Sequence, residues 1–369
     1  MKKWFVCLCM MLALTACKEE KKENANIRPV IKIGATLPLT GNIAYIGEGA
    51  KNALEMVMEK WQKAYTKYQY ELMVENDMLK IQQAVLNTHR FIDMNKVDVI
   101  VSVFGVVDRP VDELANQNKV ISLSCSHGKS KFPEYGINVG SQNEEVYAAT
   151  LNELKRRNVK KVVLVGSNSA VSNVLLDYAA EHLIKDGIEV LANEKYALGE
   201  RDYRLSIQFL EQKNPDYYLI FGVEPMNSIF IRQHHEVTNK NNLLSLGTFA
   251  NIDLDLFPKI DGLLSVYILR SENFEKEYFE RYQKRVETCS ANLYDGLDMI
   301  IKAFENTEPK EGKAIPDNAD VLRTIKSYGS WNGASGKMVI EPTGIVRPNV
   351  DMRYYHNGKW IKTEEEKLP

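Results

Sequence analysis

The chain has 369 residues, of which 44% are hydrophobic and 26% are charged, the balance of a globular protein with material for two domains. Its 47 basic and 49 acidic residues give a formal net charge of −2. Because nucleic-acid binding needs a basic excess on one face, this balance argues against a nucleic-acid partner.

The N-terminus carries the pattern of an export signal. Lys2 and Lys3 precede an apolar run over residues 4–14. This run is shorter than the roughly 20 residues that cross a bilayer, and it suits the hydrophobic region of a secretory signal. The alternative is a buried N-terminal helix, but the charge, the length and the small residues that follow agree on export. We therefore expect residues 1–16 to be a signal peptide that is removed.

The signal ends in "LTAC", residues 14–17, which resembles the lipobox of bacterial lipoproteins. That resemblance implies that Cys17 becomes the lipidated first residue of the mature chain. The polar segment that follows has nothing to bury, so we expect residues 17–29 to be a lipidated tether. The predicted location is the cell envelope, facing the periplasm, with the inner or outer membrane left open.

Two thiols remain after this processing, on Cys125 and Cys289. They are 164 positions apart in the sequence. An exported protein allows a disulfide, but sequence spacing does not show whether the geometry permits one.

Strand and helix patterns alternate along the first part of the chain. Residues 30–37 are apolar and β-branched and predict a strand, and apolar residues then recur at helical spacing as far as Trp61. Residues 97–105 form a nearly continuous apolar strand, which is typical of a parallel sheet covered by helices on both faces. The other elements expected here are strands over 68–76 and 119–124 and helices over 81–92 and 109–118.

A second alternating series begins near residue 144. It opens with a helix and the buried strand 160–167, and the alternation continues to a strand over 262–269. Helical stretches then cover 272–328, and short strands with turn signals end the chain. Two such series predict an α/β protein with two doubly wound, parallel-sheet lobes.

Four stretches resemble type I periplasmic solute-binding proteins, the branched-chain amino-acid-binding group of ABC importers. They are "IKIGATLPLTGNIAYIGEGAKNALEMVME" (31–59), the segment 196–233 with its Asn-Pro-Asp turn, "LYDGLDMI" (293–300) and "WNGASGKMVIEPTGIVRP" (331–348). The resemblance implies two lobes joined by a three-crossing hinge that close on a small solute. It divides the chain into lobe I, at 30–143 plus 268–337, and lobe II, at 144–267 plus 338–363.

The resemblance also implies a set of pocket residues in the first lobe. The loop after the third strand contains Val106 and Asp108, where amino-acid binders offer hydroxyl groups. We expect Asp108 to cap the following helix and to repel a ligand carboxylate. Cys125 and Ser126 follow the fourth strand, and Asn143 replaces the acid that holds a ligand ammonium.

In the second lobe, a family Tyr aligns with Val223 or Glu224, and a family Glu aligns with Phe249. The α-amino-acid signature is therefore largely absent, so we expect leucine, isoleucine and valine to bind poorly. Glu224 and Asp108 favour a cationic or polyhydroxylated solute. Tyr45 is either a cleft-lining aromatic residue or part of the core.

The triplet Cys125-Ser126-His127 also raises the possibility of catalysis or metal binding. A nucleophile needs a base within hydrogen-bond reach and a third group to orient that base, and adjacent loop residues rarely meet this need. A metal site needs more ligands than Cys125 and His127. Two interpretations stay open for His127, a ligand contact or an exposed residue of a packed loop. The pair at 234 and 235 shares no helix face and is expected to be solvated or half-buried.

We therefore predict a protein that is not an enzyme, that needs no cofactor or metal, and that is a monomer. Its expected function is a lipid-anchored extracytoplasmic receptor that binds a small polar solute between its lobes and delivers it to an ABC permease in the cytoplasmic membrane. The alternative is a sensory or regulatory envelope lipoprotein that uses the same fold to bind a protein partner.

Overall fold

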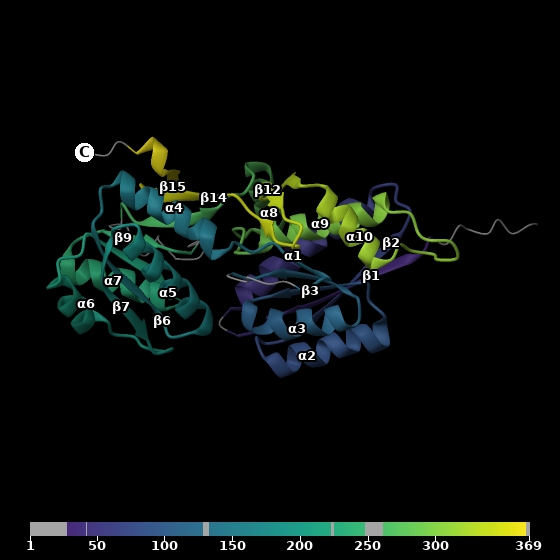
Figure 1. Ribbon diagram of the computed structural model, residues 1–369, viewed down its shortest axis with the longest axis horizontal. Coiled ribbons are helices and arrows are strands. Elements are labelled where there is room, and N and C mark those ends of the chain that lie inside the picture. The colour runs from purple at the N-terminus through teal and green to yellow at the C-terminus, as the bar shows by residue number, and fades with distance from the viewer. Residues whose placement is uncertain (1–27, 42, 128–132, 223–224, 248–260, 367–369) are drawn as a thin grey trace, which may run out of the picture.

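A computed structural model of the chain describes residues 28–366 apart from 42, 128–132, 223–224 and 248–260. Two α/β lobes lie side by side along the long axis of the molecule (Figure 1). Within the described residues, no helix combines the length and the apolar character that a bilayer crossing needs. The predicted fold class, two parallel-sheet α/β lobes, is confirmed.

The first lobe is built on a parallel sheet with the order β2-β1-β3-β4-β5. Its strands β3 and β4 are buried at every position because helices cover both faces of the sheet. The strands are β1 (Val30–Leu37), β2 (Gln69–Asn76), β3 (Val99–Val103), β4 (Ile121–Cys125) and β5 (Gly136–Asn138).

The helices of the first lobe form two layers. One layer joins β1, β3 and β4 in the main core, and the other packs on the opposite face through Ala84, Phe91 and Val111. The first layer is α1 (Ala44–Gln62), α9 (Ser290–Asn306) and α10 (Asn318–Ser327), with α8 (Glu272–Tyr282) beside α1. The second layer is α2 (Ile81–His89), the π-helical turn η1 (Arg90–Asn95) and α3 (Gly105–Gln117).

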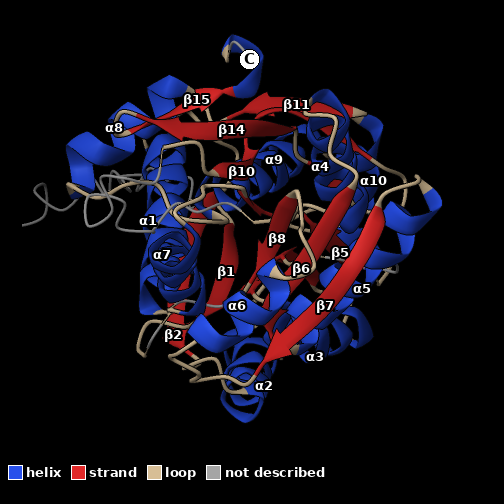
Figure 2. Ribbon diagram, turned by 90° about the vertical axis from the view of Figure 1, so that its left-hand side faces the viewer, coloured by secondary structure: helices blue, strands red, loops and turns tan. Residues whose placement is uncertain are grey.

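The second lobe has a sheet with the order β15-β14-β10-β9-β8-β6-β7, in which β14 and β15 run antiparallel to their neighbours (Figure 2). Its strands are β6 (Lys161–Ser167), β7 (Glu189–Tyr196), β8 (Tyr217–Phe221), β9 (Leu243–Ser245), β10 (Leu264–Ile268), β14 (Val350–His356) and β15 (Lys359–Lys362). One face carries α4 (Asn143–Arg156) and α5 (Ala170–Lys185). The other carries α6 (Arg204–Glu211) and α7 (Met226–Thr238), and a short 3-10 turn, η3 (Thr363–Glu365), follows β15.

The chain passes between the lobes three times, after β5, after β10 and before β14. A main-chain bond joins the second and third crossings, since Leu269 N donates to Asn349 O at 3.0 Å. Next to the first crossing, Asn138 N at the end of β5 donates to Gly344 O at 3.0 Å. The small sheet of β11 (Ser330–Gly333), β12 (Gly336–Ile340) and β13 (Val346–Arg347) precedes the third crossing.

This small sheet belongs to the first lobe. Met338, Ile340 and Val346 are buried in the same core as β1 and β4. The sequence places residues 338–347 in lobe II, whereas in the structure the third crossing comes after them, at 348–349. The reason is that the alternating apolar side chains of β12 and β13 face α9 and the first sheet.

Candidate functional site

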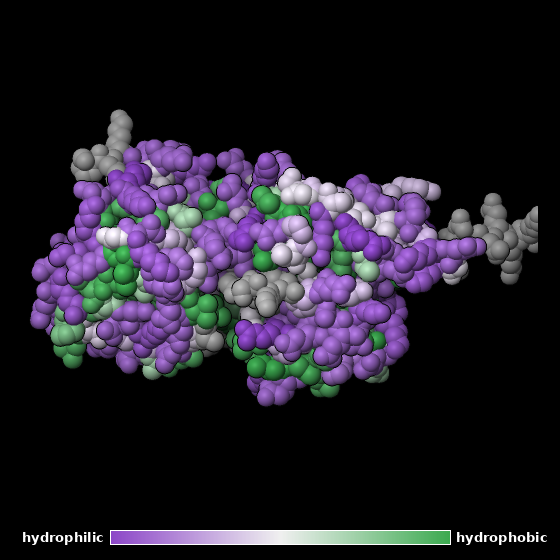
Figure 3. All heavy atoms as spheres, viewed as in Figure 1, coloured by the Kyte–Doolittle hydropathy of each residue, from purple (hydrophilic) through white to green (hydrophobic). Residues whose placement is uncertain are grey.

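The carboxyl ends of the parallel strands of both lobes face each other, which is where open α/β sheets bind ligands. A cavity of about 360 Å³ lies between them, and the molecular surface is hollowed between the lobes (Figure 3). Both lobes contribute residues that line this cavity. They are Thr40, Gly41, Ile43, Met78 and Leu79 from the first lobe, and Ser167, Ala197, Leu198, Gly199, Glu200, Arg201, Pro225 and Met226 from the second.

The first-lobe wall depends on a strained turn after β2. Met78 and Leu79 both have left-handed backbone angles, with φ of 54° and 56°. The side chain of Asn76 accepts from Met78 N at 3.0 Å, and that of Asp77 accepts from Leu79 N at 2.8 Å. These bonds hold two apolar residues in a conformation that non-glycine residues rarely adopt, so that both line the cavity.

The second-lobe wall is the segment between β7 and α6. Glu200 accepts hydrogen bonds from the backbone N–H groups of Arg201 and Asp202 at 3.2 and 3.4 Å. Among the described residues, no hydrogen-bond or ion-pair partner is found for the Arg201 guanidinium. The cavity therefore offers apolar walls, a carboxylate and a cation with five N–H donors.

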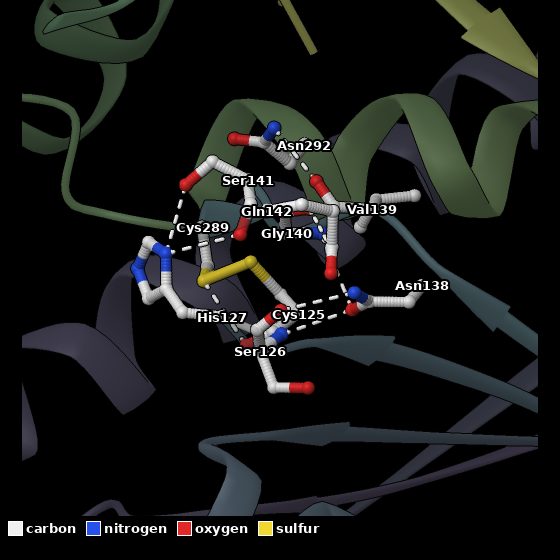
Figure 4. Close-up of a disulfide and its surroundings, with 10 residues drawn as sticks. All are labelled: Cys125, Ser126, His127, Asn138, Val139, Gly140, Ser141, Gln142, Cys289 and Asn292. Atoms are coloured by element: carbon white, nitrogen blue, oxygen red, sulfur yellow. Dashed lines mark hydrogen bonds between the residues drawn. A yellow bond between two sulfur atoms is a disulfide. The ribbon is translucent and has the colours of Figure 1, made fainter. Parts of the chain in front are cut away.

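A disulfide joins Cys125 and Cys289, both of which are buried in the core of the first lobe (Figure 4). The two Cα atoms are 5.9 Å apart, within the range that a disulfide spans. Cys125 ends β4 and Cys289 precedes α9, so the bond ties the loop after β4 to the start of that helix.

The backbone of Ser126 is fixed by Asn138. Ser126 N donates to Asn138 Oδ1 at 3.0 Å, and Asn138 Nδ2 donates to Ser126 O at 2.9 Å (Figure 4). Gly140 allows this close approach, because a Cβ there would lie 2.4 Å from Ser126 O. The backbone position of Cys125 and Ser126, at the end of β4, is therefore set by the disulfide, the Asn138 amide and the absence of a side chain at Gly140.

His127 turns from this loop toward the second lobe. Its Nδ1 lies 2.8 Å from the Ser141 hydroxyl and 3.2 Å from the Ser141 carbonyl oxygen. Its ring meets Phe221, at the end of β8, with 6.2 Å between the centroids. Burial lowers the pKa of His127 and so favours the neutral ring, although the Ser141 hydrogen bond acts in the opposite direction.

This geometry does not support nucleophilic chemistry at the triplet. The Cys125 sulfur is in the disulfide, so it is not a thiolate. The Ser126 hydroxyl is buried and meets no base among the described residues, while the His127 Nδ1 is occupied by Ser141. The described residues also contain no group of three or more His, Cys, Asp or Glu side chains that could hold a metal ion.

The structure corrects the prediction for the segment after β3. The expected loop is helical, since α3 begins at Gly105 with Phe104 as its N-cap residue. Asp108 therefore lies in the first turn of the helix and is not its cap. Its side chain is fully buried, whereas Val106 is exposed. Neither residue lines the interlobe cavity.

The other predicted site residues are not brought together in one place. Tyr45 is half-buried in the first turn of α1, and Asn143 begins α4 directly after the first crossing. Glu224 and Phe249 lie outside the described residues, as does Val223, the other candidate for the aligned tyrosine. The expectation of a solvated or half-buried pair on α7 is wrong for His234, which is fully buried against Tyr218 and Phe230.

Several cavity residues were missed from the sequence, above all Met78, Leu198 and Arg201. They lie in short connections after edge strands, and nothing in their own residue types indicates a site. The only local signal is the Asn76-Asp77 pair, which favours a turn. The cavity is formed only because the two lobes bring these connections together.

Two doubly wound lobes, three crossings and a cavity between facing strand ends define a two-lobed receptor of the kind that closes on a small solute. A family model described as "Periplasmic binding protein" matches residues 30–355, and the chain belongs to this family. Its fold is the type I form with branched-chain amino-acid-binding relatives, and the family consists of solute-binding proteins rather than enzymes.

The similar proteins cover nearly the whole chain. The Leu/Ile/Val-binding protein BraC3 of Rhizobium johnstonii is 21% identical over an alignment 360 residues long, which covers 90% of this chain and 94% of that protein. The leucine-binding protein LivK of Thermotoga maritima has a TM-score of 0.77 at 21% identity, covering 90% of this chain and 97% of the other. A solute-binding protein of an ABC transporter from Rhodopseudomonas palustris, in complex with 3,4-dihydroxybenzoic acid, has a TM-score of 0.76 at 20% identity, with 90% and 95% covered.

Proposed function

We propose that this protein is a lipid-anchored extracytoplasmic receptor that binds a small polar solute with a carboxylate group and delivers it to an ABC permease. The observation that carries the proposal is the interlobe cavity of about 360 Å³, with walls from both lobes. A solute there contacts both lobes at once, so its binding energy favours the closed form.

Arg201 is the residue that favours a carboxylate group on the solute. A guanidinium presents a planar fork of N–H donors that matches a carboxylate, and this one has no partner among the described residues. The sequence favours a cationic solute on the basis of two acids, Glu224 and Asp108. Asp108 does not line the cavity, so it gives no support to a cationic solute. The ligands named for two of the similar proteins support the same chemistry, since leucine and 3,4-dihydroxybenzoic acid both carry a carboxyl group.

The test is a thermal-shift panel on the purified mature protein, with aliphatic and aromatic acids, amino acids, amides, polyamines and sugars. A solute present at 100 times its Kd stabilises the native state by about 2.7 kcal/mol. We expect carboxylic acids to give this stabilisation and their amides to lose it. Leucine, isoleucine and valine are expected to bind weakly and to give little stabilisation.

Arg201→Ala is expected to abolish the shift given by the best acid. The matched control is Arg232→Ala, because Arg232 lies on α7 of the same lobe and does not line the cavity. An equal shift in the Arg201→Ala variant would refute the carboxylate assignment. No shift from any solute would refute the receptor function and favour the envelope regulator.

Anchoring and delivery are tested separately in cells. Cys17→Ser is expected to move the protein from the membrane to the soluble fraction, and a wild-type N-terminus at Met1 would refute the anchor. Deletion of the gene is expected to abolish uptake of the best labelled solute. Normal uptake in the deletion strain would refute the delivery function.

A further inference from the structure

A second cavity, of about 420 Å³, lies on the first lobe away from the interlobe cleft. It is lined by Lys60 near the end of α1 and by Asp298, Lys302 and Asn306, one face of α9. Since α1 begins at Ala44 beside the cleft, Lys60 is about 24 Å further along the helix axis at 1.5 Å per residue. The two cavities are therefore separate sites.

Three aromatic side chains form the walls, and polar bonds fix two of them. Trp61 Nε1 donates to Asp298 at 2.8 Å, and Asn306 Nδ2 donates to the Tyr328 hydroxyl at 3.1 Å. Trp331 lies beside Tyr328, with 5.8 Å between the ring centroids. Because these contacts hold the rings in place, a flat ligand meets walls that need little reordering on binding.

The charge of the cavity is positive. The carboxylate of Asp298 is neutralised by Lys60, whose Nζ lies 2.8 and 2.9 Å from its two oxygens. Lys302 is exposed, and within the described chain no hydrogen-bond or ion-pair partner is found for its ammonium group. The site therefore keeps one net positive charge, which favours an anion.

We propose that this cavity binds an acidic saccharide, with a pyranose ring against the indole walls and its carboxylate at Lys302. One face of a pyranose carries mostly C–H groups and packs on the negative face of an aromatic ring. The hydroxyl groups at its edge then meet the Asn306 amide and the Asp298 carboxylate. A simple aromatic acid would fill the walls but leave this polar edge unmatched. The proposal does not depend on what the interlobe cleft binds.

Intrinsic fluorescence gives a direct readout, because two of the three tryptophans that follow the predicted signal peptide, Trp61 and Trp331, lie in this site. The third, Trp360, packs on Tyr355 in the other lobe and is changed to Phe to remove its signal. The Trp360→Phe protein is titrated with glucuronate, with a glucuronate-containing oligosaccharide and with neutral glucose. We expect saturable quenching by the acidic sugars and binding of glucose weaker by about tenfold, the value of one charge-assisted hydrogen bond.

The two sources of such a ligand are distinguished in the same titration. Tighter binding of the oligosaccharide than of glucuronate assigns the site to a glycan polymer, and equal binding assigns it to a free sugar acid. Equal binding of glucose and glucuronate, or no saturable signal up to about 10 mM, would overturn the proposal.

Lys302→Met is expected to weaken glucuronate binding by about tenfold and to leave glucose binding unchanged. The matched control is Lys359→Met, since Lys359 is an exposed lysine on β15 of the other lobe. Thermal unfolding of each variant shows whether the fold is kept. Unchanged glucuronate binding in a folded Lys302→Met variant would also overturn the proposal.

Discussion

His127 of the first lobe meets Phe221 of the second lobe edge to face, with 6.2 Å between the ring centroids and 80° between the ring planes. The first residue follows β4 and the second ends β8, so the contact joins the facing ends of the two sheets. An interaction across the cleft favours the closed arrangement whether or not a solute is bound.

We predict that His127→Ala shifts the solute-free protein toward an open form. An edge-to-face pair contributes about 0.5–1.5 kcal/mol, which corresponds to a change of about 2- to 12-fold in the closed population. The radius of gyration from small-angle X-ray scattering is expected to increase. Phe221→Leu is expected to act in the same way, and the double variant is expected to add little. Fully additive effects of the two changes would show that the rings do not act as a pair.

We predict that removing the disulfide lowers the free energy of unfolding by about 2–5 kcal/mol. The bond closes a loop between positions 164 apart, and it restricts the unfolded chain accordingly. The measurement is denaturant unfolding of the Cys125→Ser/Cys289→Ser protein against the wild type. Reductant is expected to destabilise the wild type by a similar amount and to leave the double variant unaffected. The prediction would be contradicted if the disulfide of the wild type were completely reduced and its free energy of unfolding did not change.

We predict that the hydrogen bonds of the Asn138 amide contribute to both the stability of the fold and the affinity for the solute. Asn138→Ala leaves buried backbone groups of Ser126 without partners, at a cost of about 1–3 kcal/mol for each group. Gly140→Ala is expected to disturb the same loop by steric overlap with Ser126. Calorimetric unfolding and solute titration measure the two effects. The control is Asn173→Ala on α5. The Asn173 side-chain amide donates to Asn168 Oδ1 at an exposed site.

We predict that His234 makes the protein less stable as the pH falls from about 6.5 toward 4. Burial lowers the pKa of His234 to about 4, whereas the unfolded chain has a histidine pKa near 6.5. The unfolded state therefore binds the proton first, and its stability relative to the native state increases as the pH falls. At pH 5 the expected loss is about 2 kcal/mol.

Other groups also act in or near the same pH range, among them His127 and Asp295. Burial lowers the pKa of His127 and destabilises the native state at low pH in the same direction. Burial raises the pKa of Asp295 to about 6, so this group contributes more stability as the pH falls from about 6 to 4. For this reason His234→Phe must be compared with the wild type at both pH 7.5 and pH 5. An equal loss of stability in both proteins between these pH values would refute the assignment to His234.

The sequence by itself determined the architecture. The β-branched run of β3 predicts a strand covered on both faces, and all five of its residues, Val99–Val103, are buried. The boundaries predicted for β1, residues 30–37, agree with the structure. These elements were predictable because hydrophobic periodicity is a local property of the chain.

Other features required the tertiary structure. Sequence spacing left the pairing of Cys125 and Cys289 open, and only the packing of α9 beside β4 brings the two sulfur atoms together. Asp108 carries a capping signal, but α3 begins three residues earlier, at Gly105. The sequence predicts a solvated or half-buried His234, whereas the side chain is fully buried against Tyr218 and Phe230.

The interlobe cavity depends on tertiary structure most of all. Met78 and Arg201 are 123 positions apart in the chain and lie in connections whose residue types predict only turns. They line one cavity because the parallel strands of the two sheets point their carboxyl ends at each other across the hinge. Local patterns in the chain specify each sheet, but the contacts between two sheets depend on how the lobes pack, and no short stretch of sequence encodes that arrangement.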